Sequence, residues 1–330
     1  MSQENARGDS TDRLSLLADG AAADRSLDGL LPAQVDAATH SEARVVVLGA
    51  AGTGKTRVVQ ARFEWLVAEG CDPGRIGVLV PTGARAAALG ARIETRLSRG
   101  YDELNVLAPA QLAGLVLRAA GAGADPFASV LTPGDRLAML VERIDELSLR
   151  HHDFGGRPNT LLGGFVRRID RLKAELVTAK AYVTWAQALP DDAPDAELER
   201  EFAQIYCTHE RMLAEASARD DGDLIVSALD LARAQPNLAR RFDYLLLDDA
   251  QELDLAPATL AMEVSARRGV TIAGDPDAGL RRYRGAGAAR MRSFQHAERD
   301  GLRVIVLERS HRCPGRIWQA AASALGRDPS

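Results

Sequence analysis

A glycine-rich turn between an apolar run and a mixed stretch constrains the fold of this 330-residue chain more than any other feature. Residues 45–59 read VVVLGAAGTGKTRVV, and Gly49, Gly54, Lys55 and Thr56 fit the pattern G-x-x-x-x-G-K-[ST]. The run before the turn is typical of a short buried strand, and the stretch after it is typical of a helix. This order predicts a loop whose backbone N–H groups hold the phosphates of ATP. Lys55 would reach the β and γ phosphates, and the Thr56 hydroxyl would bind Mg²⁺.

Apolar runs alternate with helical patterns near both ends of the chain. Six runs are expected to form strands, at residues 43–50, 75–81, 103–109, 242–251, 268–276 and 302–312. Strands that alternate with helices predict a parallel α/β sheet.

The pattern between these two groups of strands is helical throughout. The expected division is a disordered segment at 1–27, a first part of the α/β domain at 28–115, an all-helical insertion at 116–235 and a second part at 236–330. Helices are expected in the insertion at 134–150, 161–177 and 196–218. Three separate domains are the alternative. An insertion is preferred because the late strands bring the acidic group that the early glycine turn needs.

Composition limits the possible partners and compartments. The formal net charge is −5, so a surface for nucleic acid would have to be a local basic patch. The three cysteines lie far apart in the sequence, which suits a reducing cytoplasm and indicates no metal cluster. No apolar run approaches the ~18 residues of a membrane span, so no such span is expected, and together with the cysteine usage this predicts a cytoplasmic protein.

Two adjacent acids follow the fourth expected strand. In YLLLDDAQE, at residues 244–252, Asp248 stands at the strand end and Asp249 follows it. A phosphate-binding loop needs a carboxylate to hold Mg²⁺ and a group to orient the attacking water. Asp248 would be the metal-side carboxylate and Asp249 the base. An acidic start to the next helix is an alternative that is compatible with this reading.

Arginines supply two further candidates. Arg281, Arg282 and Arg284 flank Tyr283, a combination that suits single-stranded nucleic acid because phosphates meet charge and a base stacks on the ring. A solvated basic loop is the commoner explanation. Arg312 follows the last expected strand and would approach a γ phosphate, although a surface arginine is the simpler interpretation of that residue alone.

Taken in order, these segments resemble the first motor domain of superfamily 1A DNA helicases, the UvrD/Rep/PcrA and RecB-like group, whose fold is RecA-like. The resemblance spans residues 30–320, apart from the insertion, where only length and position agree. Seven segments carry it: LLPAQVDAAT (Q motif), GAAGTGKTR (motif I), VLVPTGARAAALGARI (motif Ia), VLAPAQLAGLVLR (motif Ib), LLLDDAQELD (motif II), IAGDPDAGLRRYRGA (motif III) and LERSHRCPGRI (motif IV).

The resemblance implies a set of ATP contacts. It makes Gln34 the adenine reader, Gln251 the motif II glutamine and Arg312 the γ-phosphate arginine. It extends the phosphate loop to Ala50, Ala51, Gly52, Thr53 and Arg57. The implied catalytic set is Lys55, Asp248, Asp249, Gln251 and Arg312.

The resemblance also implies DNA contacts and a pathway. Thr82 and Arg85 occupy polar positions of the DNA-contacting motif Ia, and Tyr283 and Arg284 lie in motif III. The implied protein is an ATP-dependent 3′→5′ DNA helicase that binds single-stranded and duplex DNA. The Ala- and Arg-rich style resembles the AdnA-type subunit of AddAB and AdnAB helicase–nucleases, which would pair with a second subunit in double-strand break repair and recombination.

Departures from the family pattern weaken the expected motor. Asp249 replaces a glutamate, which retracts the carboxylate by roughly 1.5 Å. Ala278 replaces a coupling glutamine, APAQ replaces T-F-H-S in motif Ib, and His311 replaces the motif IV tyrosine. Slow hydrolysis is expected, and a subunit with a vestigial ATPase and a structural role is the alternative. A P-loop ATPase unrelated to helicases would require the ordered match to be accidental.

The motifs of a second motor domain do not occur in these 330 residues. Either the chain is a fragment of a longer protein or it is a truncated product. Because an ATP site of this family closes between two domains, we expect that the chain alone does not unwind DNA.

Overall fold

The computed structural model describes residues 26–326 apart from 98–99, 120, 122–124, 154, 240, 265–267, 280–290, 292–293, 295–301, 313 and 325. Residues 1–25, most of the segment expected to be disordered, lie outside the described residues.

Six parallel strands form one sheet in the order β3–β2–β4–β5–β1–β6. The strands are β1 (Arg44–Gly49), β2 (Ile76–Leu79), β3 (Asn105–Leu107), β4 (Tyr244–Leu247), β5 (Gly269–Gly274) and β6 (Leu302–Leu307). Strand β1 lies between two late strands, with Val47 paired to Ala273 on one side and to Ile305 on the other. The prediction of a parallel α/β sheet interrupted by a helical insertion is therefore confirmed.

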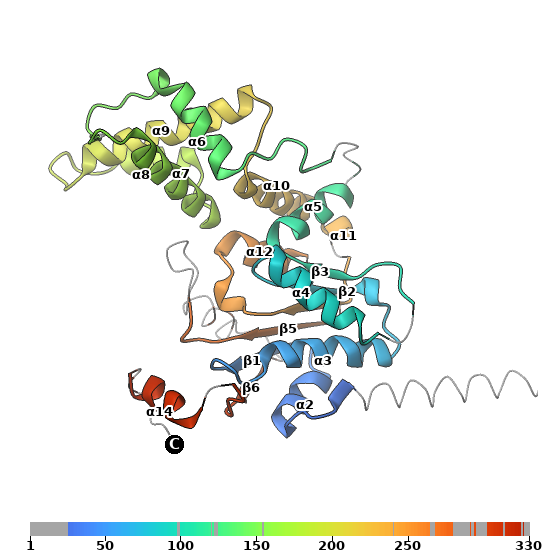
Figure 1. The fold of residues 1–330 in the computed structure, drawn as a ribbon. Coiled ribbons are helices and arrows are strands. Elements are labelled where there is room, and N and C mark those ends of the chain that lie inside the picture. Colours follow the sequence, from blue (N-terminus) through green and yellow to red (C-terminus); the bar gives the residue numbers. More distant parts are fainter. Residues whose placement is uncertain are drawn as a thin grey trace, which may run out of the picture.

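Helices cover both faces of the sheet, because successive side chains of a buried parallel strand point to opposite faces. Val45 and Val47 of β1 pack into one core, and Val46 and Leu48 pack into the other. The first core is covered by α2 (Pro32–Thr39), α3 (Lys55–Ala68) and α4 (Gly83–Glu94). The second is covered by α5 (Pro109–Ala119), α10 (Asp221–Ala234) and α12 (Leu255–Glu263), on the opposite side in Figure 1.

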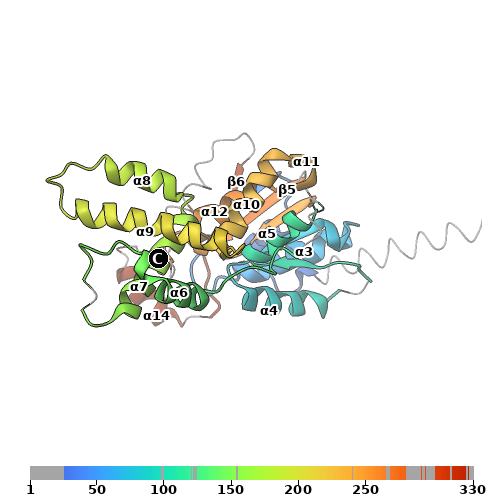
Figure 2. The same cartoon turned by 90° about the horizontal axis from the view of Figure 1, so that it is seen from above.

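Four helices extend away from the sheet and share a core of their own (Figure 2). They are α6 (Pro133–Glu142), α7 (Pro158–Ala174), α8 (Ala179–Gln187) and α9 (Ala196–Glu215). Phe165, Tyr182 and Phe202 form a chain of ring contacts in the centre of this core. The helix expected at 134–150 is shorter than predicted: α6 ends at Glu142, and a 3-10 turn, η2 (Ile144–Glu146), brings Leu147 back into the core.

The remaining described elements are short connections and a C-terminal helix: η1 (Pro73–Arg75), α11 (Pro236–Ala239), η3 (Ala250–Glu252) and α14 (Gly315–Ala324). Within the described part of the chain, no helix combines the length and the apolar composition that crossing a membrane requires.

Candidate functional site

The glycine-rich turn joins β1 to α3 at the carboxyl edge of the sheet and wraps around the Lys55 side chain. The Lys55 ammonium donates to the Gly49 carbonyl at 2.6 Å and to the Ala50 carbonyl at 2.9 Å. Burial lowers the pKa of Lys55, while the carboxylates of Asp275 and Asp248 oppose this shift. The cation is thus held ready at the start of a helix, where an anion is favoured.

Two glycines of this loop have left-handed backbones and close neighbours. Gly54 has φ +90°, and a Cβ there would lie 2.5 Å from the Gln34 amide nitrogen. Gly52 has φ +81°, and a Cβ would lie 2.7 Å from Cβ of Arg312. The loop therefore requires glycine for its conformation and for its close contact with the segment after β6.

That segment is hydrogen bonded directly to the loop. The His311 N–H donates to the Gly52 carbonyl at 2.8 Å, and the Ser310 hydroxyl donates to the Ala51 carbonyl at 2.9 Å. These contacts fix the backbone next to Arg312. Arg312 lines the same cleft as Lys55.

Asp248, which follows β4, meets Thr56 of α3. The Thr56 hydroxyl donates to the Asp248 carboxylate at 2.7 Å. Burial raises the pKa of Asp248, and the hydrogen bond from Thr56 opposes the shift. A hydroxyl and a carboxylate that converge on one point are the oxygen ligands that Mg²⁺ prefers, so this pair fits such an ion.

Asp249 adopts a left-handed backbone, with φ +50° and ψ +44°. Its side chain forms an ion pair with Arg85 of α4 and accepts a hydrogen bond from the Gln251 amide at 3.2 Å. The side-chain oxygen of Gln251, Oε1, in turn accepts from the Asp275 N–H, at the end of β5, at 3.0 Å. The second acid is therefore linked to two neighbouring elements.

These elements enclose a cleft of about 660 Å³. Most of the predicted site residues line it: Ala51, Gly52, Gly54, Lys55, Thr56, Arg57, Arg85, Asp248, Asp249, Gln251 and Arg312. Ala278, predicted to stand at the position of the coupling glutamine, also lines the cleft.

Other predicted residues have different surroundings. Gln34 lies beside the loop, where its amide donates to the Thr53 carbonyl at 2.9 Å and its oxygen accepts from the Leu31 N–H at 2.9 Å. Thr82 caps α4, accepting from the Arg85 N–H at 3.3 Å. Tyr283 and Arg284, with Arg281 and Arg282, lie outside the described residues.

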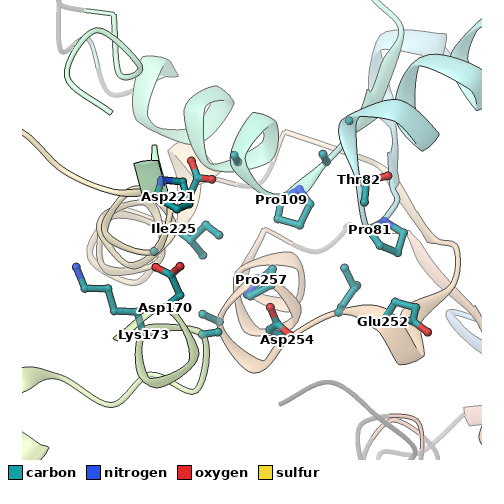
Figure 3. A pocket seen from close by; sticks show the side chains of 18 of the residues that line it. Pro81, Thr82, Pro109, Asp170, Lys173, Asp221, Ile225, Glu252, Asp254 and Pro257 are labelled. Atoms are coloured by element: carbon teal, nitrogen blue, oxygen red, sulfur yellow. The ribbon is translucent and has the colours of Figure 1, made fainter. Parts of the chain in front are cut away.

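Thr82 lines a second cavity of about 340 Å³ at the base of the helical insertion. Figure 3 shows Asp170 and Lys173 of α7 on one side of it and Pro81 and Thr82 on the other. Its charged lining comprises four carboxylates and two cations: Asp170, Asp221, Glu252, Asp254, Arg136 and Lys173. This excess of negative charge disfavours the entry of a phosphate.

Sequence reasoning missed several residues of the larger cleft, among them Arg92 and Asp275. Arg92 lines it from α4 and donates to the Gln60 side chain at 2.6 Å. Its spacing of seven residues from Arg85, about two helical turns, was the signal that could have found it. Asp275 also lines the cleft. Its position directly after a buried strand was a comparable signal.

The sequence profile of the UvrD/REP helicase N-terminal domain matches residues 30–298. The chain belongs to this family. The resemblance to UvrD/Rep/PcrA-like helicases is thereby confirmed, whereas the AdnA-type assignment stays a prediction.

Two relatives of this helicase domain illustrate the similarity. The chain is 26% identical over 307 residues to the ATP-dependent DNA helicase PcrA of Bacillus subtilis, covering 91% of the chain and 40% of the relative. It is 28% identical over 326 residues to the ATP-dependent DNA helicase UvrD1 of Mycobacterium tuberculosis, covering 93% of the chain and 40% of the relative. The chain thus spans about 40% of the length of these relatives.

Proposed function

We propose that this chain is the ATP-binding half of a DNA-dependent ATPase motor belonging to an ATP-dependent 3′→5′ DNA helicase. The observation that carries this proposal is the meeting of Thr56 and Asp248 beside Lys55. Two segments far apart in the sequence converge there on the chemistry that a nucleotide triphosphate requires.

The chain's own side chains divide the work of phosphoryl transfer. Lys55 and the loop N–H groups bind the phosphates, and Arg312 stands at the γ-phosphate side. Thr56 and Asp248 would hold Mg²⁺, which when bound supplies positive charge that neutralises the phosphates. Asp249 orients the attacking water and accepts its proton. Gln251 links Asp249 to the end of β5.

DNA would bind next to the nucleotide cleft, on the motif Ia segment with Thr82 and Arg85, of which Arg85 also lines the cleft, and on the motif III residues Tyr283 and Arg284. A helicase–nuclease of the AdnA type in double-strand break repair, with a second subunit as partner, is the pathway we favour. This assignment to a helicase–nuclease rests on the Ala- and Arg-rich composition of the sequence and on the altered motifs. A protein with this role would be located in the cytoplasm.

The division into a first part at 28–115, an insertion at 116–235 and a second part at 236–330 belongs to the same proposal. The separate core of α6 to α9 supports it. The insertion would guide DNA, as its position in the family implies.

A vestigial ATPase is the second candidate function. The observation that favours it is the engagement of Asp249 by Arg85 and Gln251, together with Ala278 in the coupling position. In that case the subunit would serve a structural, DNA-binding role.

Nucleotide affinity and hydrolysis test the proposal. Lys55→Ala removes the phosphate cation and should weaken binding of a fluorescent ATP analogue by about 10- to 100-fold, the worth of a charge-assisted hydrogen bond. Lys180→Ala, on the exposed surface of α8, is the matched control and should leave the affinity unchanged. Equal affinities for Lys55→Ala and the unmodified chain would contradict the nucleotide site. Hydrolysis that single-stranded DNA accelerates favours the motor, and hydrolysis that it leaves unchanged favours the vestigial subunit.

A further inference from the structure

The ion pair between Arg85 and Asp249 joins two parts of the cleft that have different proposed tasks. Arg85 lies in the first turn of α4, just after its cap Thr82, on the segment proposed to contact DNA. Asp249 follows β4 and is the proposed base. Both residues line the nucleotide cleft, so the contact lies where hydrolysis would occur.

Both carboxylate oxygens of Asp249 have a side-chain partner. Oδ2 meets the Arg85 guanidinium, and Oδ1 accepts from the Gln251 amide at 3.2 Å. A general base needs a lone pair within hydrogen-bond reach of the water that it deprotonates. With both oxygens engaged, Asp249 is held in a geometry that competes with water binding.

The two donors differ in how readily they can leave. Gln251 is buried, and its side-chain oxygen Oε1 accepts a hydrogen bond from the Asp275 N–H at 3.0 Å. The Arg85 side chain is 51% exposed, whereas that of Asp249 is only 20% exposed. Arg85 is therefore the partner that a molecule arriving from solvent can reach.

A nucleic acid phosphate is the anion best suited to draw Arg85 away. A guanidinium binds phosphate through two parallel hydrogen bonds, and such pairs are among the strongest that it makes. The cavity beside Thr82 carries four carboxylates against two cations in its lining, so it disfavours a phosphate. A backbone phosphate at the start of α4 would instead meet the exposed guanidinium.

We propose that Arg85 is a positioning residue that restrains Asp249 until a phosphate of single-stranded DNA displaces it. Release of the guanidinium frees Oδ2 for the attacking water. The inference rests on the proposed ATPase function and assigns its DNA dependence to one contact.

Single-turnover hydrolysis of γ-labelled ATP by an excess of the full chain tests this role, with and without an oligodeoxythymidylate. Arg85→Ala should raise the rate of ATP hydrolysis without DNA by roughly fivefold, because an exposed ion pair contributes up to about 1 kcal/mol. DNA should then add little. The affinity for ATP should stay unchanged, because Lys55 and its loop are untouched. Arg85→Lys should restore part of the restraint.

Two controls separate restraint from a general effect. Arg233→Ala removes an ion pair with Glu263 on the distant surface, where the arginine is 50% exposed, and should leave the rates unchanged. In an Asp249→Asn background, Arg85→Ala should no longer accelerate hydrolysis.

The outcomes distinguish the two levels of the argument. If the unmodified chain hydrolyses ATP faster than Lys55→Ala, but Arg85→Ala is no faster than the unmodified chain, the restraint is wrong and the proposed ATPase function stands. If Arg85→Ala is slower, Arg85 serves the phosphates of ATP and the restraint is equally wrong. If neither the unmodified chain nor Arg85→Ala hydrolyses ATP faster than Lys55→Ala, both the ATPase function and this inference are contradicted. If Arg85→Ala hydrolyses ATP faster than Lys55→Ala but the unmodified chain does not, the restraint by Arg85 is supported in its strongest form.

Discussion

Lys173 holds together the base of the helical insertion, and its replacement by methionine should destabilise the chain strongly. Its ammonium lies 2.8 Å from Asp220, 2.6 Å from Asp223 and 2.8 Å from Glu210. These carboxylates belong to α9 and to the start of α10, and Lys173 belongs to α7. The network therefore ties the insertion to a helix that packs against the sheet.

The magnitude follows from burial. The Lys173 side chain is 4% exposed and that of Asp220 is 1% exposed. Burial works against the charge of Lys173, but the carboxylates outweigh it and raise its pKa. Removing one member of a buried ion pair costs about 3–5 kcal/mol because the other charge stays buried. Arg136, 3.0 Å from Asp220, keeps the loss from being larger.

Urea unfolding followed by circular dichroism measures the loss. Lys180→Met makes the same change at an exposed position of α8 and should stay within about 0.5 kcal/mol of the unmodified chain. The loss in Lys173→Met should shrink between pH 7 and pH 5, because carboxylates without their cation take up protons more readily. A loss at pH 7 within about 1 kcal/mol of the Lys180→Met value would refute the reasoning.

Two further predictions concern stability. Burial, with the charge of Arg62, lowers the pKa of His40 to about 4, so neutral His40 stabilises the fold above pH 6.5 and this contribution is lost as pH falls toward 4. Unfolding free energy should drop by about 2 kcal/mol from this group between pH 7 and pH 5. His40→Gln should flatten that drop in urea titrations, and an unchanged pH slope would contradict the assignment. Ser217, exposed at the end of α9, has φ +50° and a Schellman pattern of bonds, so Ser217→Gly should add about 1 kcal/mol. A lower melting temperature in that variant would count against the backbone argument.

The fold was accessible from the sequence because its signals are local. Each strand is a short apolar run, and the residues of the glycine turn alone predict a phosphate-binding loop. The placement of the late strands in one domain with β1 followed from one chemical requirement, that the loop find an acid. Asp248 fulfils it through the bond from Thr56.

The contacts that regulate such a site were not accessible, since they depend on how helices pack. Nothing in the order of residues says that the first turn of α4 lies against the end of β4, so the partner of Arg85 could not be named. Gln34 stays a predicted adenine reader, and its side-chain hydrogen bonds with Leu31 and Thr53 were not visible in the sequence. The ion-pair network around Lys173 joins helices α6, α7, α9 and α10, and no signal in the sequence indicated it either.

The shorter acid of motif II has a backbone explanation that the sequence alone does not offer. Asp249 has φ +50°, a conformation that aspartate tolerates better than longer side chains do. Its reach is fixed by that turn and by its bonds to Arg85 and Gln251. A site that had lost its use would be free to lose the Thr56–Asp248 bond and the lysine cradle as well, yet both are present. An intact phosphate site beside an engaged acid favours a motor whose hydrolysis waits for DNA over one whose hydrolysis has decayed.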